Sequence, residues 1–168
     1  MDEALTWEEK SRKKWIPPEE LQKKVAELKK SGKTLATLNG SFDLMHAGHL
    51  HMIYEASKQA DVLIVALNSD ASIKKYKSET RPIISLEDRL KMMSALFFVD
   101  YVTWFEETDP RSVLQVIKPD VHVNGAEYGE FCIESQVVKD GGGKLHIVPL
   151  IAGLSTSAII KKIKSTPV

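Results

Sequence analysis

The chain has 168 residues, of which 43% are hydrophobic and 27% are charged, and its formal net charge at pH 7 is zero. This length supports one domain with a substantial core, and the composition is typical of a soluble globular protein. The balanced charge gives no overall field that attracts nucleic acid or a membrane surface, so we expect neither as a partner. Cys132 is the single cysteine, which excludes an intrachain disulfide.

The same features favour a cytoplasmic location. The scarcity of cysteine fits a reducing compartment, and the polar amino-terminal residues show no secretory signal. The longest apolar runs are far too short to span a bilayer. Aromatic residues make up 7% of the chain and are not interleaved with a basic stripe, as a nucleic-acid surface would require.

The first 33 residues are predicted to form an arm and a helix that precede the main domain. Residues 1–16 are polar, include Trp7 and Trp15, and have no clear period. We expect them to be a frayed arm, or to dock on the domain or on a second subunit. A helix is predicted after Pro17 and Pro18, and it ends at Gly32, because proline favours helix starts and glycine favours helix ends.

From residue 34 to residue 165, predicted strands and helices alternate. The strands are expected over residues 34–38, 62–67, 101–105, 121–123 and 145–148. The helices are expected over residues 47–59, 71–76, 85–99, 109–117, 134–140 and 155–163. Five such repeats with short connections predict an α/β fold: a Rossmann-like, doubly wound, five-stranded parallel sheet in a single domain.

The segment from Asn39 to His49 lies where the first predicted strand passes into a helix. Ligands of parallel sheets bind beyond the carboxyl ends of the strands, and a helix N-terminus favours phosphate. His46 and His49 are three residues apart and therefore share one face of the opening helical turn. Gly40 and Gly48 allow a ligand to approach the backbone closely. The pattern predicts a phosphate site.

Other roles for these residues remain open. The histidine pair could bind a metal, but zinc needs three or four nitrogen or sulfur ligands and no further pattern supplies them. We therefore predict no protein-bound metal. Asp43 could cap the turn, orient a histidine or help to place Mg²⁺. His51 breaks the helical period and is expected on another face.

The residues Ser155, Thr156 and Ser157 follow Gly153 at the start of the last predicted helix. An ordinary helix cap explains one hydroxyl residue at such a position. Three in succession exceed what a cap needs, and they can donate to a phosphate that the helix N–H groups already hold. We therefore predict a second phosphate-binding segment here.

Two further groups of residues are candidates for the site. Lys77, Arg81 and Arg89 belong to a basic stretch that could be merely solvated, or could clamp the charge that develops during phosphoryl transfer. Asn124, Gly125 and Glu127 follow the fourth predicted strand at its carboxyl end, so they should also face the ligand. The pattern alone does not say which part of a substrate they would meet.

The residues Gly40-Ser41-Phe42-Asp43-Leu44-Met45-His46-Ala47-Gly48-His49 resemble the GxFDxxHxGH signature of the cytidylyltransferase-like nucleotidyltransferases. The segment from Leu154 to Ile160 resembles the second signature of that family, a Ser/Thr-rich helix start. Within the family, residues 39–162 are most similar to the adenylyltransferases of ADP-heptose synthesis. The chain departs from the usual pattern at Asn124, where many relatives carry lysine.

The resemblance implies that ATP reacts with a sugar 1-phosphate, such as D-glycero-D-manno-heptose 1-phosphate, to give an ADP-sugar and pyrophosphate. It implies Mg²⁺ bridging the ATP phosphates, and catalysis by His46, His49, Lys77 and Arg81. The nucleotide-binding residues that it implies are Asn39, Gly40, Ser41, Phe42, Gly48, Gly125, Glu127, Ser155, Thr156 and Ser157. The substrate-binding residues that it implies are Asp43, Asn68, Asp70, Arg89 and Asn124.

Two alternative functions stay open at this point. The chain could be a cytidylyltransferase acting on glycerol 3-phosphate or a similar phosphomonoester, because the residues say little about the base. It could also be a non-catalytic nucleotide-binding module, although the full set of histidines and hydroxyl residues exceeds what a binder needs. Proteins of this family often form dimers, so we also expect a homodimer.

Overall fold

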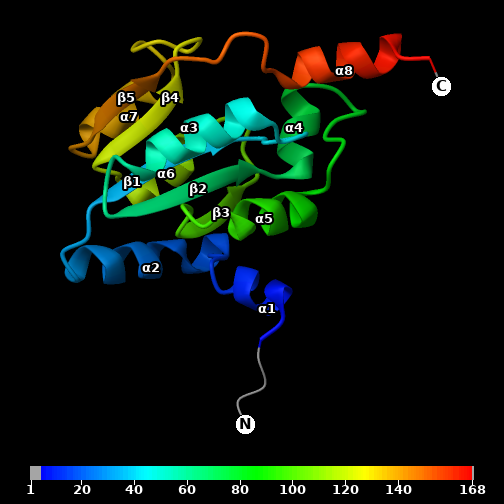
Figure 1. Cartoon of the computed structure of the whole chain (residues 1–168). Helices are drawn as coiled ribbons and strands as arrows, with labels where there is room; N and C mark the ends of the chain where they lie inside the picture. The colour runs from blue at the N-terminus through cyan, green and yellow to red at the C-terminus, as the bar shows by residue number, and fades with distance from the viewer. Residues whose placement is uncertain (1–4, 168) are drawn as a thin grey trace.

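The computed structural model describes residues 5–167 and shows a single α/β domain built on a five-stranded sheet (Figure 1). The strands lie in the order β3-β2-β1-β4-β5, and all neighbouring pairs are parallel. This confirms the predicted Rossmann-like sheet, and its topological switch point falls between β1 and β4. The strand bounds are β1 Leu35–Gly40, β2 Val62–Asn68, β3 Tyr101–Phe105, β4 Val121–Gly125 and β5 Lys144–Val148.

Helices cover both faces of the sheet (Figure 1). On one face lie α3 (Ala47–Ser57) and α5 (Leu86–Ala95), and on the other lie α2 (Pro18–Lys30), α6 (Arg111–Ile117) and α7 (Ser135–Asp140). The other described helices are α1 (Trp7–Arg12), α4 (Asp70–Tyr76) and α8 (Thr156–Ser165).

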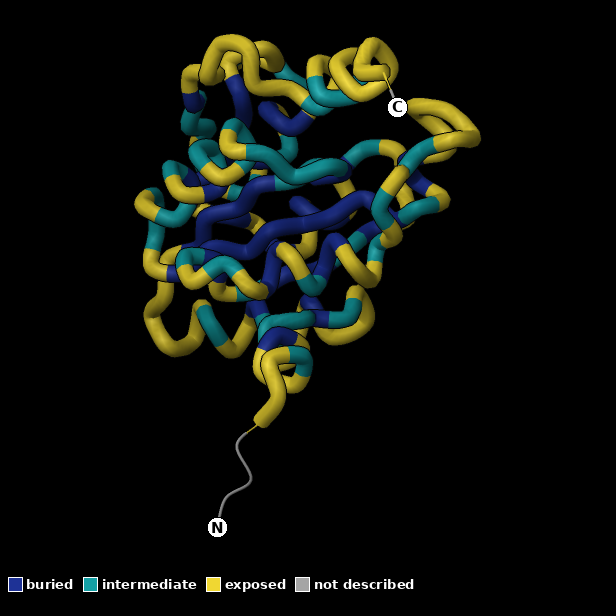
Figure 2. The backbone as a smooth tube through the Cα atoms, turned by 45° about the vertical axis from the view of Figure 1, so that its right-hand side comes forward, coloured by how far each residue is buried: buried dark blue, intermediate teal, exposed yellow. Residues whose placement is uncertain are grey.

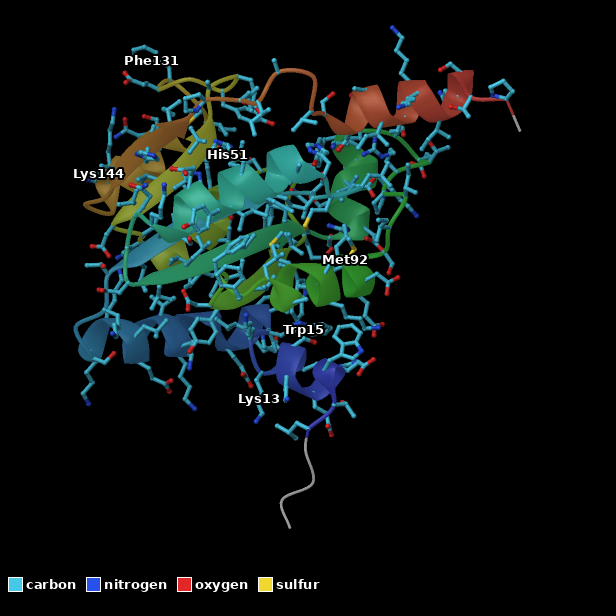
Figure 3. All side chains as sticks on the ribbon, viewed as in Figure 1. Lys13, Trp15, His51, Met92, Phe131 and Lys144 are labelled. Carbon is cyan, nitrogen blue, oxygen red and sulfur yellow. The ribbon has the colours of Figure 1, made fainter. Side chains whose placement is uncertain are left out.

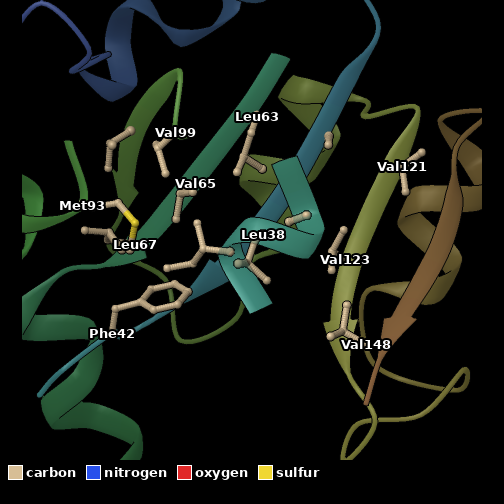
Figure 4. Packing of buried hydrophobic residues seen from close by; sticks show 14 of the residues in the cluster. Leu38, Phe42, Leu63, Val65, Leu67, Met93, Val99, Val121, Val123 and Val148 are labelled. Carbon is tan, nitrogen blue, oxygen red and sulfur yellow. The ribbon is translucent and has the colours of Figure 1, made fainter. Parts of the chain in front are cut away.

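The core consists of two apolar layers, one on each face of the sheet, because side chains alternate along a strand. In β2, Leu63 and Val65 pack in the layer under α3 and α5, whereas Ile64 and Ala66 pack in the layer under α2 and α6. Every residue of β2 is buried, as the continuous apolar run predicts for a central parallel strand. Figure 2 shows the strands as the buried centre of the molecule, and Figure 4 shows the first layer from close by.

Residues 5–16, the part of the predicted arm that the structure describes, are more ordered than the sequence indicates, and residues 1–4 lie outside the described range. Helix α1 was not predicted, although Thr6 and Glu9 form a capping box at its start. Of the predicted alternatives, docking on the domain is the one that the structure shows. Trp15 pairs with Val102 in an isolated parallel bridge, and its Nε1–H donates to Ser94 Oγ at 2.7 Å.

Several element boundaries differ from the predicted ones. Strands β1 and β4 each run two residues further than expected, so their polar last residues remain within the sheet. Helix α6 begins after Pro110 rather than at it, and Asp109 Oδ1 accepts from the Arg111 N–H. No helix within residues 5–167 combines the length and apolar character needed to cross a membrane. Helix α8 extends away from the sheet and none of its residues is buried (Figures 1 and 2).

Candidate active site

The two histidines of the first motif stack at the start of α3, with ring centroids 3.8 Å apart and an angle of 24° between the ring planes. His46 is the N-cap residue, and its Nδ1 accepts from the Gly48 N–H at 3.1 Å. The His46 N–H in turn donates to His49 Nδ1 at 3.3 Å. The helix start thus holds both imidazoles in one arrangement.

These backbone contacts determine which nitrogen of each ring carries the proton. An Nδ1 that accepts a hydrogen bond is unprotonated in a neutral imidazole, so the proton lies on Nε2. Burial lowers the pKa of His49 to about 4, with the charges of His46 and Lys77 acting in the same direction. Burial also lowers the pKa of His46. Near neutral pH, both rings are therefore neutral donors through Nε2–H.

The two motifs, far apart in the sequence, border one cavity of about 330 Å³. The start of α8 lies beside the start of α3 because Thr156 Oγ1 donates to the Asp43 carbonyl oxygen at 3.1 Å. Ser155 caps α8 through the Ala158 N–H. We call this space the histidine cavity. Its lining consists of His46, Gly48, His49, His51, Met52, Glu127, Tyr128, Pro149, Leu150, Ile151, Leu154, Ser155, Thr156 and Ser157.

At two glycines of the predicted site, an added side chain would force neighbouring side chains to move. A Cβ on Gly48 would lie 3.0 Å from ring atoms of His46 and 3.1 Å from the Leu154 Cβ. A Cβ on Gly125 would collide with the carboxylate of Glu127. His51, predicted on another face of the helix from His49, also borders this cavity.

A second cavity, of about 350 Å³, opens at the carboxyl ends of β1, β2 and β4, and we call it the strand-end cavity. Tyr128 borders both cavities. The residues of the first motif Asn39, Gly40 and Ser41 line this second space rather than the histidine cavity. The full lining is Asn39, Gly40, Ser41, Asn68, Tyr76, Lys77, Thr108, Asp109, Pro110, Asn124, Tyr128, Ile133 and Glu134.

Lys77 lines the strand-end cavity and lies near enough to His49 for its charge to act on that ring. Its Nζ donates to Ser41 Oγ at 3.2 Å in the strand-end cavity, and its charge contributes to the lowered pKa of His49. Burial and the neighbouring charge of Arg81 lower the pKa of the Lys77 ammonium group itself. A phosphate that spans the two cavities would meet this cation.

Asp43 is a structural residue, so the prediction that it contacts a substrate needs correction. It is 1% exposed and borders neither cavity. Its carboxylate accepts from Arg81 Nε at 2.8 Å and from the N–H groups of Ile83 and Ile84. Burial acts to raise the pKa of this carboxyl, but these donors together hold it below its usual value.

Arg89 lines neither cavity, which corrects the prediction of a direct contact from it. Arg81 is also outside both linings, but its buried Nη2 donates to no described group, so a ligand contact from it stays a prediction. Arg89 has no exposed surface, and it donates to the carbonyl oxygens of Ser41, Asn68 and Ile84. Its Nη2 also donates to Asp70 Oδ1 at 2.7 Å, so the carboxylate of Asp70 is the ion-pair partner of Arg89. A buried guanidinium is satisfied by such partners, which explains why Arg89 does not reach a ligand.

The remaining predicted residues divide between wall and core. Phe42 lies in the core, where its ring meets that of His49 edge-on at 5.3 Å between centroids, and it borders neither cavity. Gly125 likewise borders neither. Asn68 and Asn124 are nearly fully buried and both line the strand-end cavity.

Residues that the sequence did not single out complete both walls. Glu134 comes from the loop after β4, and Leu150 and Ile151 come from the loop before α8. Their only signal was position, since both loops follow strands at the ligand side of the sheet. Phe131 belongs to the same loop as Tyr128 but is 98% exposed and points away from the molecule (Figure 3).

In the part of the chain that the structure describes, no three His, Cys, Asp or Glu side chains are grouped so that they could hold a metal ion. The stacked histidines therefore stand without the further ligands that zinc requires.

Residues 37–166 match the family described as cytidylyltransferase-like. The bifunctional protein HldE of Campylobacter concisus is 44% identical over 136 residues, which are 80% of this chain and 28% of that protein. HldE of Helicobacter pylori is 46% identical over 76% of this chain and 27% of its own length. HldE of Wolinella succinogenes is 38% identical over 93% of this chain and 32% of its own length. The chain thus spans less than a third of these relatives.

Solved structures show the same fold. A lipopolysaccharide core biosynthesis protein from Thermoplasma volcanium has a TM-score of 0.58 and 27% identity, covering 71% of this chain and 98% of that chain. A pantoate-beta-alanine ligase from Francisella tularensis has a TM-score of 0.60 and 19% identity, covering 86% of this chain and 72% of that chain. At this identity the match shows a similar fold and nothing further. By its family match and its relatives, the chain belongs to the cytidylyltransferase-like family and is a nucleotidyltransferase.

Proposed function

We propose that the chain transfers the adenylyl group of ATP to a sugar 1-phosphate, and that pyrophosphate is released. D-glycero-D-manno-heptose 1-phosphate is the proposed acceptor, and the cytoplasm the proposed location. The observation that carries the proposal is the meeting of His46 and His49 with Ser155, Thr156 and Ser157 around one cavity. The printed names of the relatives, bifunctional protein HldE and lipopolysaccharide core biosynthesis protein, support a carbohydrate pathway.

The chemistry requires positioning and charge stabilisation rather than a protein nucleophile. An oxygen of the sugar phosphate attacks the α-phosphorus of ATP in line, and the bond to the pyrophosphate oxygen breaks. The attacking phosphate oxygen is already anionic, so no base needs to remove a proton from it. Neutral imidazoles with Nε2–H groups suit this reaction because they donate to phosphate oxygens as negative charge develops.

The triphosphate is proposed to occupy the histidine cavity and the acceptor to occupy the strand-end cavity. The contact of Lys77 with Ser41 in the strand-end cavity and the effect of its charge on His49 support a role for this cation where the two phosphates would meet. Tyr128 forms part of both walls. Arg81 and Arg89 are proposed to act indirectly, by holding the loop and strand ends that carry Ser41 and Lys77 in place.

Mg²⁺ is proposed to enter with ATP. This ion keeps several waters and is commonly held by substrate phosphates with few protein ligands, and there it neutralises phosphate charge. The site fits that role, since Glu127 is the one carboxylate among the residues that border the histidine cavity. Glu127 is the residue that would contact the ion or its waters.

A pyrophosphate-release screen tests the proposal. ATP and CTP are each combined with a heptose 1-phosphate, a hexose 1-phosphate, glycerol 3-phosphate and ethanolamine phosphate. We expect more pyrophosphate release with ATP and the heptose 1-phosphate than with any other pair. Preference for CTP with glycerol 3-phosphate would establish the alternative cytidylyltransferase, and nucleotide binding without release in any pair would establish a non-catalytic module.

We also propose that the protein forms a homodimer. Helix α8 carries Ile159, Ile160 and Ile163, has no buried residue and leaves Ile163 62% exposed. A second copy would cover this apolar side. Sedimentation equilibrium measures the mass in solution, and a monomer at high micromolar concentration would reject this proposal.

A further inference from the structure

The strand-end cavity has two chemically different walls. Lys77 and Ser41 provide a cation and a hydroxyl group, joined by a 3.2 Å hydrogen bond. Asn39, Asn124 and Glu134 provide amide and carboxylate groups and no cation. A ligand that fits both walls carries an anionic group and, apart from it, neutral groups that donate hydrogen bonds.

Glu134 is the unusual member of the second wall. It precedes α7, it is only 6% exposed, and its Oε2 accepts from Asn124 Nδ2 at a long 3.4 Å. None of the ion pairs within residues 5–167 includes it. A carboxylate has about four lone-pair positions, so Glu134 keeps accepting capacity for a ligand beside its contacts with Asn124 and the Cys132 thiol.

The neighbours of Glu134 are also buried polar groups with unused capacity. Asn124 is 4% exposed, and its Nδ2 is divided between Glu134 and the Cys132 sulfur. Asn39 has a buried Oδ1 that no described group contacts. Buried polar atoms in native proteins nearly always have hydrogen-bond partners, so this wall is complete only when donors from a ligand or from water reach it.

The floor behind this wall is fixed by a buried histidine. His122 has no exposed surface, and its Nδ1 lies 2.8 Å from Thr37 Oγ1 on the neighbouring strand. His122 and Asn124 lie two residues apart on β4 and therefore point to the same face of the sheet. Glu134 is near enough for its charge to act on the His122 ring.

We propose that Glu134, with Asn39 and Asn124, is the wall that selects the acceptor by recognising its hydroxyl groups. The inference rests on the proposed function, which it deepens by assigning acceptor specificity to this wall. Sugar hydroxyls donate to a carboxylate and to amide oxygens, whereas a carboxylate or second phosphate would be repelled by Glu134. The acceptor phosphate then faces Lys77. A site built to hydrogen-bond a hydroxyl strongly rejects analogues that lack it.

Titration calorimetry with the full chain and a non-hydrolysable ATP analogue tests this inference. The ligands are a hexose 1-phosphate and methyl phosphate, which share the phosphate but differ in hydroxyl groups. Glu134→Gln preserves shape and removes the charge, and Glu130→Gln on the same loop is the matched control because Glu130 is exposed. We expect Glu134→Gln to weaken hexose 1-phosphate binding by about tenfold or more. Binding of methyl phosphate and of the ATP analogue should change less than about twofold.

Each other outcome counts against the inference. Equal affinity of the unmodified protein for the two phosphates would overturn it, and so would an equal loss for both ligands in Glu134→Gln. If Glu134→Gln does not fold, Asn39→Ala is titrated with the same two ligands. We expect it also to weaken hexose 1-phosphate binding and to leave methyl phosphate binding nearly unchanged. Absence of pyrophosphate release with every acceptor would reject the proposed function, whereas these binding measurements would still decide the role of the wall.

Discussion

Asp43 and Arg81 form a buried ion pair, with Arg81 Nε 2.8 Å from Asp43 Oδ2. The same carboxylate accepts from the N–H groups of Ile83 and Ile84, and the Asp43 carbonyl oxygen accepts from Thr156. One residue of the first motif thereby holds the loop after α4 and the start of α8. It connects the two segments that border the histidine cavity, so the geometry of that cavity depends on a residue outside it.

Replacement of Asp43 by alanine is expected to lower the free energy of unfolding by about 3–5 kcal/mol. The change leaves the guanidinium of Arg81, whose side chain is 18% exposed, without its partner. Urea denaturation followed by circular dichroism measures the loss. Asp109→Ala is the control, because its partner Arg111 is exposed to solvent and the loss should be much smaller. Equal losses in both variants would contradict the structural role of Asp43.

His49→Ala is expected to lower kcat for pyrophosphate release by about 10²–10³-fold while the protein stays folded. The variant loses one donor to the developing charge, and such donors typically have effects of this size. His146→Ala, on β5 outside both cavities, is the matched control and should retain its turnover. A folded His49→Ala protein with near-normal kcat would show that the histidine cavity is not the reaction site.

Gly48→Ala is expected to reduce turnover although it changes a single hydrogen atom to a methyl group. The new Cβ would lie 3.0 Å from the His46 ring and 3.1 Å from Leu154, so the stacked imidazoles must shift. Catalysis is sensitive to displacements of about 1 Å. Steady-state kinetics should show a fall in kcat. Gly129→Ala is the comparison, because it has open space around it, and its effect should be confined to the strain of its positive φ.

Arg89→Lys is expected to affect stability far more than acceptor binding. Lysine cannot reach all the carbonyl oxygens that the Arg89 guanidinium contacts, and unsatisfied buried acceptors cost about 1–3 kcal/mol each. We expect a lower melting temperature, with an acceptor KM within about twofold of normal at temperatures where the variant is folded. A large rise in KM without loss of stability would restore the idea of a direct substrate contact.

The free energy of unfolding is expected to fall as the pH falls from about 6.5 toward 4. Burial lowers the pKa of His122 to about 4, although the charge of Glu134 opposes the shift, and burial lowers the pKa of His49 to about 4. An imidazole in the unfolded chain titrates near 6.5, so in this window the unfolded state binds more protons. For His122 the slope approaches about 1.4 kcal/mol per pH unit.

Urea denaturation at a series of pH values measures this slope, and His122→Asn should reduce it. The asparagine can still contact Thr37 but does not titrate, so the variant isolates the contribution of His122. An unchanged slope in a folded His122→Asn protein would show that the buried histidine is not the titrating group. Aspartates with lowered pKa values, such as Asp43, change the free energy of unfolding at lower pH, below the range in which the histidines titrate.

Much of the fold follows from local patterns in the sequence. The apolar run of β2 predicts a strand covered on both faces, and Ser85 and Ser155 are N-caps, as hydroxyl residues before helices indicate. Helix α1 was missed because its six residues have only one buried member and little periodicity. Short helices of this kind depend on caps and on docking rather than on an apolar face.

The site was only partly predictable, for a different physical reason. The histidine motif and the Ser155–Ser157 segment could be found from sequence because their spacing is local. Whether a charged residue faces a ligand depends on partners far along the chain. Arg89 donates to a carbonyl group 48 residues away, and Asp43 accepts from residues about 40 positions away.

The sequence by itself determined that strands and helices alternate, and that imidazoles and hydroxyls follow strand ends, where we propose that phosphate binds. These properties depend on residue types a few positions apart. Only the tertiary structure decided that Asp43 and Arg89 belong to the scaffold and that Glu134 belongs to a cavity wall. Burial and hydrogen-bond satisfaction are set by groups that folding brings together, so no local pattern records them.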